Sequence, residues 1–118
     1  MKEGIKMKVN VGGNQYFVDV HHIDSKITLG GVETPCRATK ITLEIPNAKA
    51  AESNSTPLIA ETFTYCSPQE QFSRREGRRR AADRLLKLTK AMNFFDKTQR
   101  GQLFRQVCPE YFKNEHAV

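Results

Sequence analysis

The residues whose types and spacing most clearly suggest a binding function are the arginines of the stretch 71–90. This stretch carries eight Lys or Arg residues against only Glu76 and Asp83. The whole chain has a net charge of +6, yet residues 1–60 hold seven Lys/Arg and six Asp/Glu, so the excess is local. A guanidinium group binds phosphate or carboxylate through two parallel hydrogen bonds. The cluster therefore predicts the binding of an anion.

Two of these arginines fall on the apolar face of a predicted helix. With Leu85 at the centre of that face, Arg74 and Arg78 each lie about 20° away from it when the chain advances 100° per residue. An unpaired buried charge is costly, so each needs a partner. The partner is an anionic ligand, a carboxylate of the fold or a neighbouring subunit; a solvated face is the remaining interpretation. The apolar residues of this packing face are Ala81, Ala82, Leu85, Leu88 and Met92.

Aromatic and small residues surround the arginines. Phe72 is a core residue or a ring on which a nucleobase stacks, and Tyr65 is close enough in sequence to share the same pocket. Gly77 either weakens the helix by about 1 kcal/mol relative to alanine or allows a ligand or backbone to approach. Arg105 closes the pocket from a second helix or faces solvent. The predicted ligand-binding residues are Tyr65, Phe72, Arg74, Gly77, Arg78 and Arg105.

The other side of the long helix is also basic, which leaves nucleic-acid binding as an alternative. Glu76 and Asp83 interrupt this side and can form local pairs at helical spacing. No known DNA- or RNA-binding signature is present. The residues concerned are Arg75, Arg79, Arg80, Lys87 and Lys90.

Motifs for catalysis and cofactors are missing. The sequence contains no P-loop, GxGxxG or GxSxG pattern. His21 and His22 are adjacent, so a strand would point them to opposite sides and they would not share a metal. The three cysteines form no CxxC pair and are interpreted as small buried residues. We therefore expect no catalytic residue, no metal and no cofactor, with a small hydrolase as the alternative. The cysteines are Cys36, Cys66 and Cys108.

The N-terminal half alternates apolar and polar residues with the period of a β-strand. Gly12-Gly13 and Gly30-Gly31 each separate two such runs, which predicts two β-hairpins with tight turns. Residues 46–57 are small and polar and predict a surface loop. The remaining strand is 58–66, so the predicted antiparallel sheet spans residues 5–66.

The C-terminal half carries helix start signals. Ser67, with Pro68 next and Glu70 three residues on, predicts a capping box that begins a helix over about 68–92. Asp96 with Gln99 predicts a second helix over 97–107. Strands followed by helices predict one α+β domain spanning residues 1–118.

Composition adds expectations about location and assembly. Apolar residues make up 38% of the chain and tryptophan is absent. A thin core favours self-association, so we expect a dimer or a higher oligomer. The N-terminal residues show no long apolar run, so neither a signal peptide nor a membrane span is expected.

The stretch YCSPQEQFSRREGRRRAADR, residues 65–84, resembles small phage-encoded proteins. In these a strand ends in cysteine, a Pro-acid-x-Phe step follows, and a Gly-Arg-x-x-Ala-x-x-Arg helix comes next. The stretch is similar to the Thoeris anti-defence sponges of the first type. That resemblance implies a viral protein in the cytoplasm of an infected bacterium. It would sequester a cyclic nucleotide signal of Thoeris or CBASS immunity, either a cyclic ADP-ribose-like molecule or a cyclic oligonucleotide, without cleaving it.

The resemblance also implies a nucleotide pocket near a subunit interface, lined by Phe72, Arg74 and Arg78. Arg105 lies outside the similar stretch, and its place in the pocket follows from charge and position alone. The alternative remains a basic protein that binds nucleic acid or inhibits CRISPR.

Overall fold

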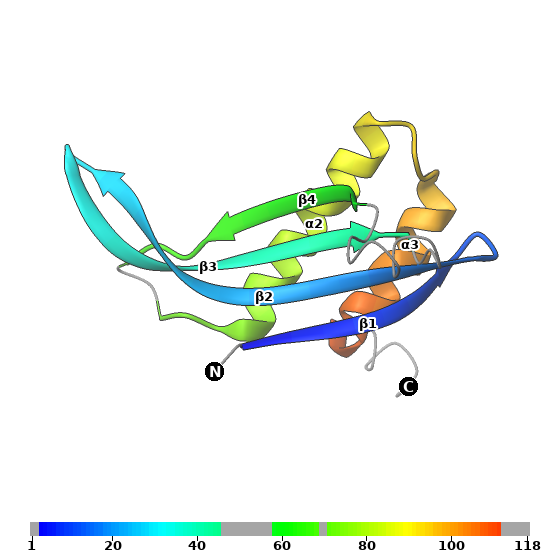
Figure 1. The fold of residues 1–118 in the computed structure, drawn as a ribbon, viewed down its shortest axis with the longest axis horizontal. Helices are drawn as coiled ribbons and strands as arrows, with labels where there is room; N and C mark the ends of the chain where they lie inside the picture. Colours follow the sequence, from blue (N-terminus) through cyan, green and yellow to red (C-terminus); the bar gives the residue numbers. More distant parts are fainter. Residues whose placement is uncertain (1–2, 46–57, 69–70, 112–118) are drawn as a thin grey trace, which may run out of the picture.

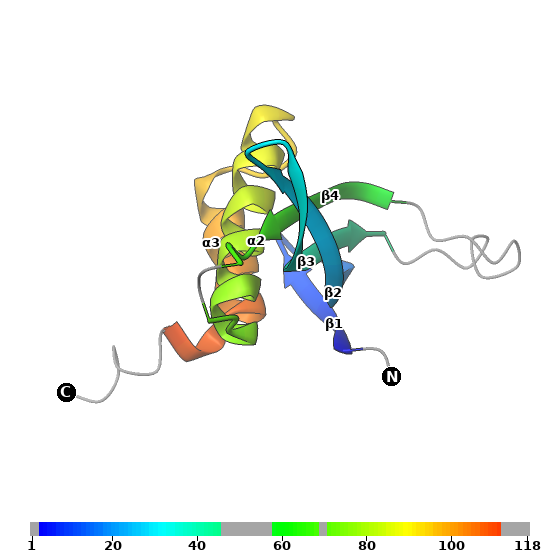
Figure 2. The same cartoon turned by 90° about the vertical axis from the view of Figure 1, so that its left-hand side faces the viewer.

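Two layers make up the protein, a four-stranded antiparallel sheet and a layer of helices that covers one side of it (Figures 1 and 2). The computed structural model describes residues 3–45, 58–68 and 71–111. The predicted α+β class, with the sheet first and the helices after it, is confirmed. The predicted surface loop 46–57 lies outside the described residues.

The strands follow one another in the sheet in chain order. Gly12 and Gly13 join the first two strands, and Gly30 and Gly31 join the next two, all four with φ between 57° and 83°. Such positive values suit glycine and form the tight turns that the sequence predicted. The strands are β1 (Glu3–Val11), β2 (Asn14–Leu29), β3 (Val32–Glu44) and β4 (Leu58–Tyr65).

The two hairpins share a strand, which the sequence did not predict. β2 is one continuous strand of 16 residues, and β3 begins at Val32, directly after the second glycine pair. Beyond His22, β2 pairs with β3 alone and no helix of the described chain covers it, so polar residues are tolerated and the apolar alternation is less regular. The pairing of β1 ends at His22 and that of β4 ends at Ala38, so the rest of β2 and β3 projects as a two-stranded ribbon (Figure 1).

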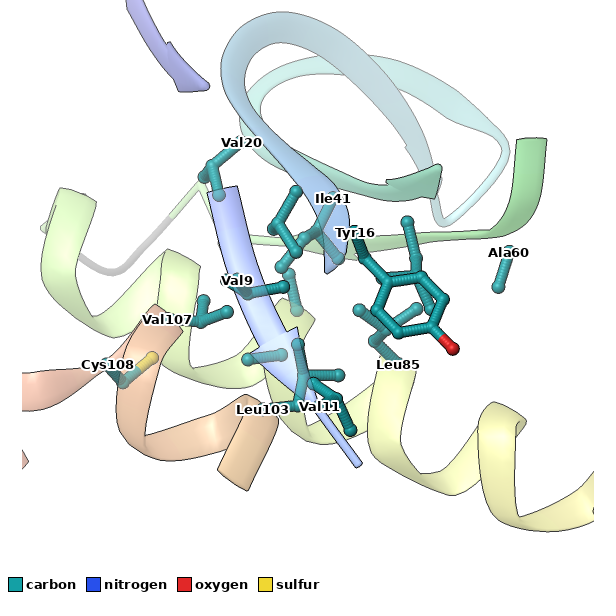
Figure 3. Close-up of a cluster of buried hydrophobic side chains, with 14 of the residues drawn as sticks. Val9, Val11, Tyr16, Val20, Ile41, Ala60, Leu85, Leu103, Val107 and Cys108 are labelled. Atoms are coloured by element: carbon teal, nitrogen blue, oxygen red, sulfur yellow. The ribbon is translucent and has the colours of Figure 1, made fainter. Parts of the chain in front are cut away.

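The core fills the space between the sheet and the helices. Every second residue of β1, β2 and β3 points to the helices, and these side chains are fully buried in the middle of the sheet. Leu85 contributes from the first helix, and Leu103 and Val107 contribute from the second (Figure 3).

The first helix, α2 (Arg74–Ala91), starts six residues later than predicted. Ser73 is its N-cap, and the Ser73 hydroxyl accepts a hydrogen bond from the backbone N–H of Glu76. Ser67 and Ser73 are each followed three residues later by glutamate, so the sequence offers two similar start signals. The later one is used because the segment before it is held by Phe72, whose ring contacts His22 and Arg37.

The second helix, α3 (Lys97–Val107), has the predicted bounds. Asp96 and Gln99 form the predicted capping box. A short 3₁₀ helix, η1 (Pro109–Tyr111), follows. Met92, predicted for the packing face, is instead exposed, because α2 ends one residue before it. Neither helix of the described chain is long and apolar enough to cross a membrane.

Candidate functional site

A pocket of about 110 Å³ lies where the N-terminal end of α2 meets β3 and β4. Strand β3 contributes Arg37 and Thr39, and β4 contributes Thr64 and Tyr65. The segment before α2 contributes Gln71, Phe72 and Ser73. The first turns of α2 add Glu76, Gly77 and Arg80, and Cys66 completes the wall. The pocket thus combines two guanidinium groups, one carboxylate, several hydroxyl groups and two aromatic rings.

Arg37 and Phe72 form a stacked pair on one side of this pocket. The Arg37 guanidinium carbon lies 4.9 Å from the centre of the Phe72 ring, and Arg37 Nη1 donates a hydrogen bond of 3.0 Å to Asp24. The His22 ring meets Phe72 edge-on, with centroids 5.3 Å apart. A second, more open pocket of about 250 Å³ shares Arg37, Phe72 and Cys66. The stacked pair therefore separates two adjoining pockets.

The floor of the first pocket is a buried hydroxyl. Thr39 is 1% exposed, and its Oγ1 lies 2.9 Å from Nδ1 of His22. Gly77 packs directly over this hydroxyl, because a Cβ atom at position 77 would overlap Thr39 Oγ1. The glycine therefore has the close-approach role that was one of its two interpretations, and the approaching group is a side chain of β3.

Glu76 is the carboxylate on the wall, and several side chains donate hydrogen bonds to it. Arg79 Nε donates to both of its oxygens at 3.1 and 3.2 Å, Arg80 Nε lies 3.3 Å from Oε1, and the Tyr111 hydroxyl donates to Oε2 at 3.3 Å. The hydrogen bonds from Arg79 lower the pKa of Glu76 to about 2. The same interaction raises the pKa of Arg79.

Of the predicted ligand-binding residues, the structure brings Tyr65, Phe72 and Gly77 together in the pocket. Arg74, Arg78 and Arg105 are not among the residues that line it. Arg74 is exposed rather than on the packing face, because it is the first residue of α2 and precedes the turns that meet the sheet. Arg78 is half-buried and forms an ion pair with Glu110 of η1, as the structural salt-bridge interpretation predicted.

Both arginines of the pocket were missed as ligand-binding candidates. Arg80 was assigned to the outer basic side of the helix, and Arg37 was not singled out. No local pattern marks Arg37, whereas Arg80 lies three residues after Gly77, a spacing that places the two on neighbouring parts of one helix face.

Local ion pairs offset part of the charge on the outer basic side. Arg79 and Arg80 both contact Glu76, and Lys87 Nζ lies 3.2 Å from Asp83 Oδ2. Arg75 lies over the ring of Tyr111, 5.5 Å from its centre. Glu76 and Asp83 thus offset two of the five positive charges that the sequence places on this side, and three remain.

The cysteines match the sequence interpretation in part. No disulfide joins the three of them; Cys36 and Cys108 are buried, but Cys66 is only partly so. Within the described ranges, no group of three or more His, Cys, Asp or Glu residues is placed to hold a metal ion. Comparison of the chain with known protein families, curated proteins and solved structures finds no match.

Proposed function

We propose that the protein binds a nucleotide-type ligand in the paired pockets at the start of α2 and holds it without cleaving it. The observation that carries this proposal is the Arg37–Phe72 stack, which is shared by two adjoining pockets, the first of them also lined by Arg80. A ring and guanidinium groups side by side are what a base and a phosphate each require.

The size of the site supports a ligand larger than free phosphate. Small-molecule pockets usually measure about 300–1,000 Å³. The pocket of about 110 Å³ is too small for a nucleotide, but together with the adjoining opening of about 250 Å³ it reaches the lower end of that range. A ligand of this class would therefore have to occupy both sides of the Arg37–Phe72 stack.

The pocket residues suit different parts of a nucleotide, according to their chemistry. Phe72 offers a ring face, and Arg37 and Arg80 offer hydrogen bonds to phosphate oxygens. Across the two pockets these arginines are paired with carboxylates, Arg37 with Asp24 and Arg80 with Glu76, so a bound phosphate would take the place of those carboxylates on the guanidinium groups.

Retention without cleavage is part of the proposal. The nearest hydroxyl–imidazole pair is Thr39 with His22, and the nearly complete burial of Thr39 beneath Gly77 supports a structural role for it. The resemblance of residues 65–84 to anti-defence sponges favours a cyclic nucleotide immune signal as the ligand, in the cytoplasm of an infected bacterium.

Calorimetric titration tests the proposal, with cyclic dinucleotides, cyclic trinucleotides, cyclic ADP-ribose isomers and duplex DNA as probes. We expect one cyclic nucleotide to bind and to be recovered unchanged after heat denaturation of the complex. A recovered product would make the protein a hydrolase. Binding of duplex DNA alone, with an affinity that falls steeply with salt, would favour the nucleic-acid alternative.

Three matched arginine variants locate the site. Arg80→Gln removes a guanidinium group from the pocket, and we expect affinity to fall about 10- to 100-fold, the worth of a hydrogen bond to a charged group. Arg74→Gln and Arg105→Gln make the same change outside the lining and should bind normally. Equal losses in all three variants would contradict the placement of the ligand in this pocket.

A further inference from the structure

The ribbon formed by the ends of β2 and β3 is strictly two-sided. Every second residue from Ile23 to Leu29 and from Val32 to Ala38 lies on one side, because strand neighbours alternate. None of these residues is charged, and we call this the uncharged side of the ribbon. Tyr65 extends it, since Tyr65 pairs with Ala38, which pairs with Ile23.

The opposite side of the ribbon holds the charges, and they are paired. Arg37 contacts Asp24 at 3.0 Å, and Lys26 Nζ lies 3.9 Å from Glu33 Oε2. These side chains are satisfied within the chain and can remain in water. The segregation gives the ribbon one polar side and one side suited to burial.

Large apolar residues on the uncharged side are open to solvent. Val32 is 65% exposed, Leu29 is 46% exposed and Tyr65 is 45% exposed. A two-stranded ribbon is at best marginally stable alone in water, and gains stability when a further layer covers an apolar side. Figure 1 shows the ribbon extending past β1 and β4. Burial of its uncharged side against a partner surface would therefore stabilise the ribbon.

Side chains already occupy some of the backbone hydrogen-bonding groups on the edge strands β1 and β4. A partner is therefore expected to pack on a face of the sheet and not to add a strand at its edge. Gln106 of α3 accepts a hydrogen bond from the Asn10 N–H and donates one to the Asn10 carbonyl, at 2.8 and 2.7 Å. On the other edge strand, Arg84 donates to the Phe63 carbonyl at 3.0 Å. Side chains thus occupy the edge positions through which another strand would add at these points.

We propose that the uncharged side of the ribbon packs against the same side of a second copy of this chain. A side without charges is complementary to itself, because a twofold contact buries no unpaired ion. If the ribbon depends on a partner to stay folded, that partner must be present whenever the chain is synthesised, and a second copy of the chain meets this condition.

The size of the contact sets its strength. Seven residues along two strands give a side about 23 Å long and 10 Å wide. The ring of Tyr65 enlarges it on β4, but it stays below the area of about 800 Å² per partner that is typical of specific complexes. We therefore expect a dimer that dissociates at micromolar concentrations, independently of any ligand.

Two threonines on the same ribbon make a matched test. Thr34 lies on the uncharged side opposite Ile27, and Thr28 lies on the charged side opposite Glu33. We expect sedimentation velocity between about 1 µM and about 500 µM to show a monomer–dimer equilibrium for the wild type and for Thr28→Lys. Thr34→Lys would bury a lysine ammonium at the contact and should remain monomeric over the same range.

A monomeric wild type at the highest concentration overturns the proposal, as does a dimer that survives in Thr34→Lys or dissociates equally in both variants. If Thr34→Lys does not fold, hydrogen exchange of the wild type decides. Amides of residues 25–35 should become more protected as concentration rises, and protection that is independent of concentration refutes the interface.

Discussion

The substitution Gly77→Ala tests the close approach of α2 to β3. Glycine in a helix interior costs about 1 kcal/mol relative to alanine, so on an open helix the change would be stabilising. At position 77 the added methyl group would overlap Thr39 Oγ1, and it would also lie 3.4 Å from Phe72 Cε2. Thr39 cannot move freely, because it is 1% exposed and its hydroxyl contacts His22.

The magnitude follows from these opposing effects. Overpacking a tight contact costs about 1–3 kcal/mol, which offsets the propensity gain of about 1 kcal/mol and leaves a net loss of up to about 2 kcal/mol. Removing the hydroxyl should reverse the sign. In a Thr39→Ala background, Gly77→Ala should stabilise the protein by up to about 1 kcal/mol, so the two positions should be coupled by about 1–3 kcal/mol.

Urea unfolding of the four proteins in this cycle measures that coupling. Gly101→Ala is the control, since Gly101 lies in α3 with no atom within 4 Å of an added Cβ, and it should stabilise by about 1 kcal/mol. If Gly77→Ala stabilises the protein as much as Gly101→Ala does, α2 does not approach β3 closely and the floor of the pocket is not as described.

Three further predictions concern the helices and the thiols. The pKa of Glu76 is lowered to about 2, so its ion pairs stabilise the fold above the usual glutamate pKa of 4.5 and are lost as pH falls toward 2; Glu76→Gln should flatten that decline in acid unfolding curves. Gln106→Ala frees the Asn10 N–H and carbonyl at the sheet edge and should lower the free energy of unfolding by about 1–2 kcal/mol, with faster aggregation in light scattering. With a thiol reagent at neutral pH, Cys66 should react first and Cys108 only on unfolding, because burial raises the pKa of the Cys108 thiol; rapid modification of Cys108 in the folded protein would contradict its burial.

The start of α2 shows why a helix can be predicted correctly from a capping pattern while its first residue is predicted wrongly. Ser67 and Ser73 offer nearly the same capping pattern, and propensity cannot choose between them. The choice is made by Phe72, which is held between His22 and Arg37 of the sheet. The second helix was predicted with its observed bounds because Asp96 has no competing cap nearby.

The pocket was only half predictable for a similar reason. Tyr65, Phe72 and Gly77 lie within one short stretch, so their chemistry could be recognised together. Arg78 was also recognised as needing a partner, but its carboxylate, Glu110, is 32 residues away in the sequence. Arg37 carries no local signal, because its importance comes from its position beside a ring that lies 35 residues later.

The α+β class, the two glycine turns and the second helix follow from local sequence patterns, because alternation, positive φ and a capping box each depend on neighbouring residues. The identity of the arginines that line the pocket, the ion pairs of the others and the extension of β2 into a ribbon became visible in the folded chain alone. Those features depend on strand register and on the placement of α2 across the sheet, which bring residues far apart in the chain into contact.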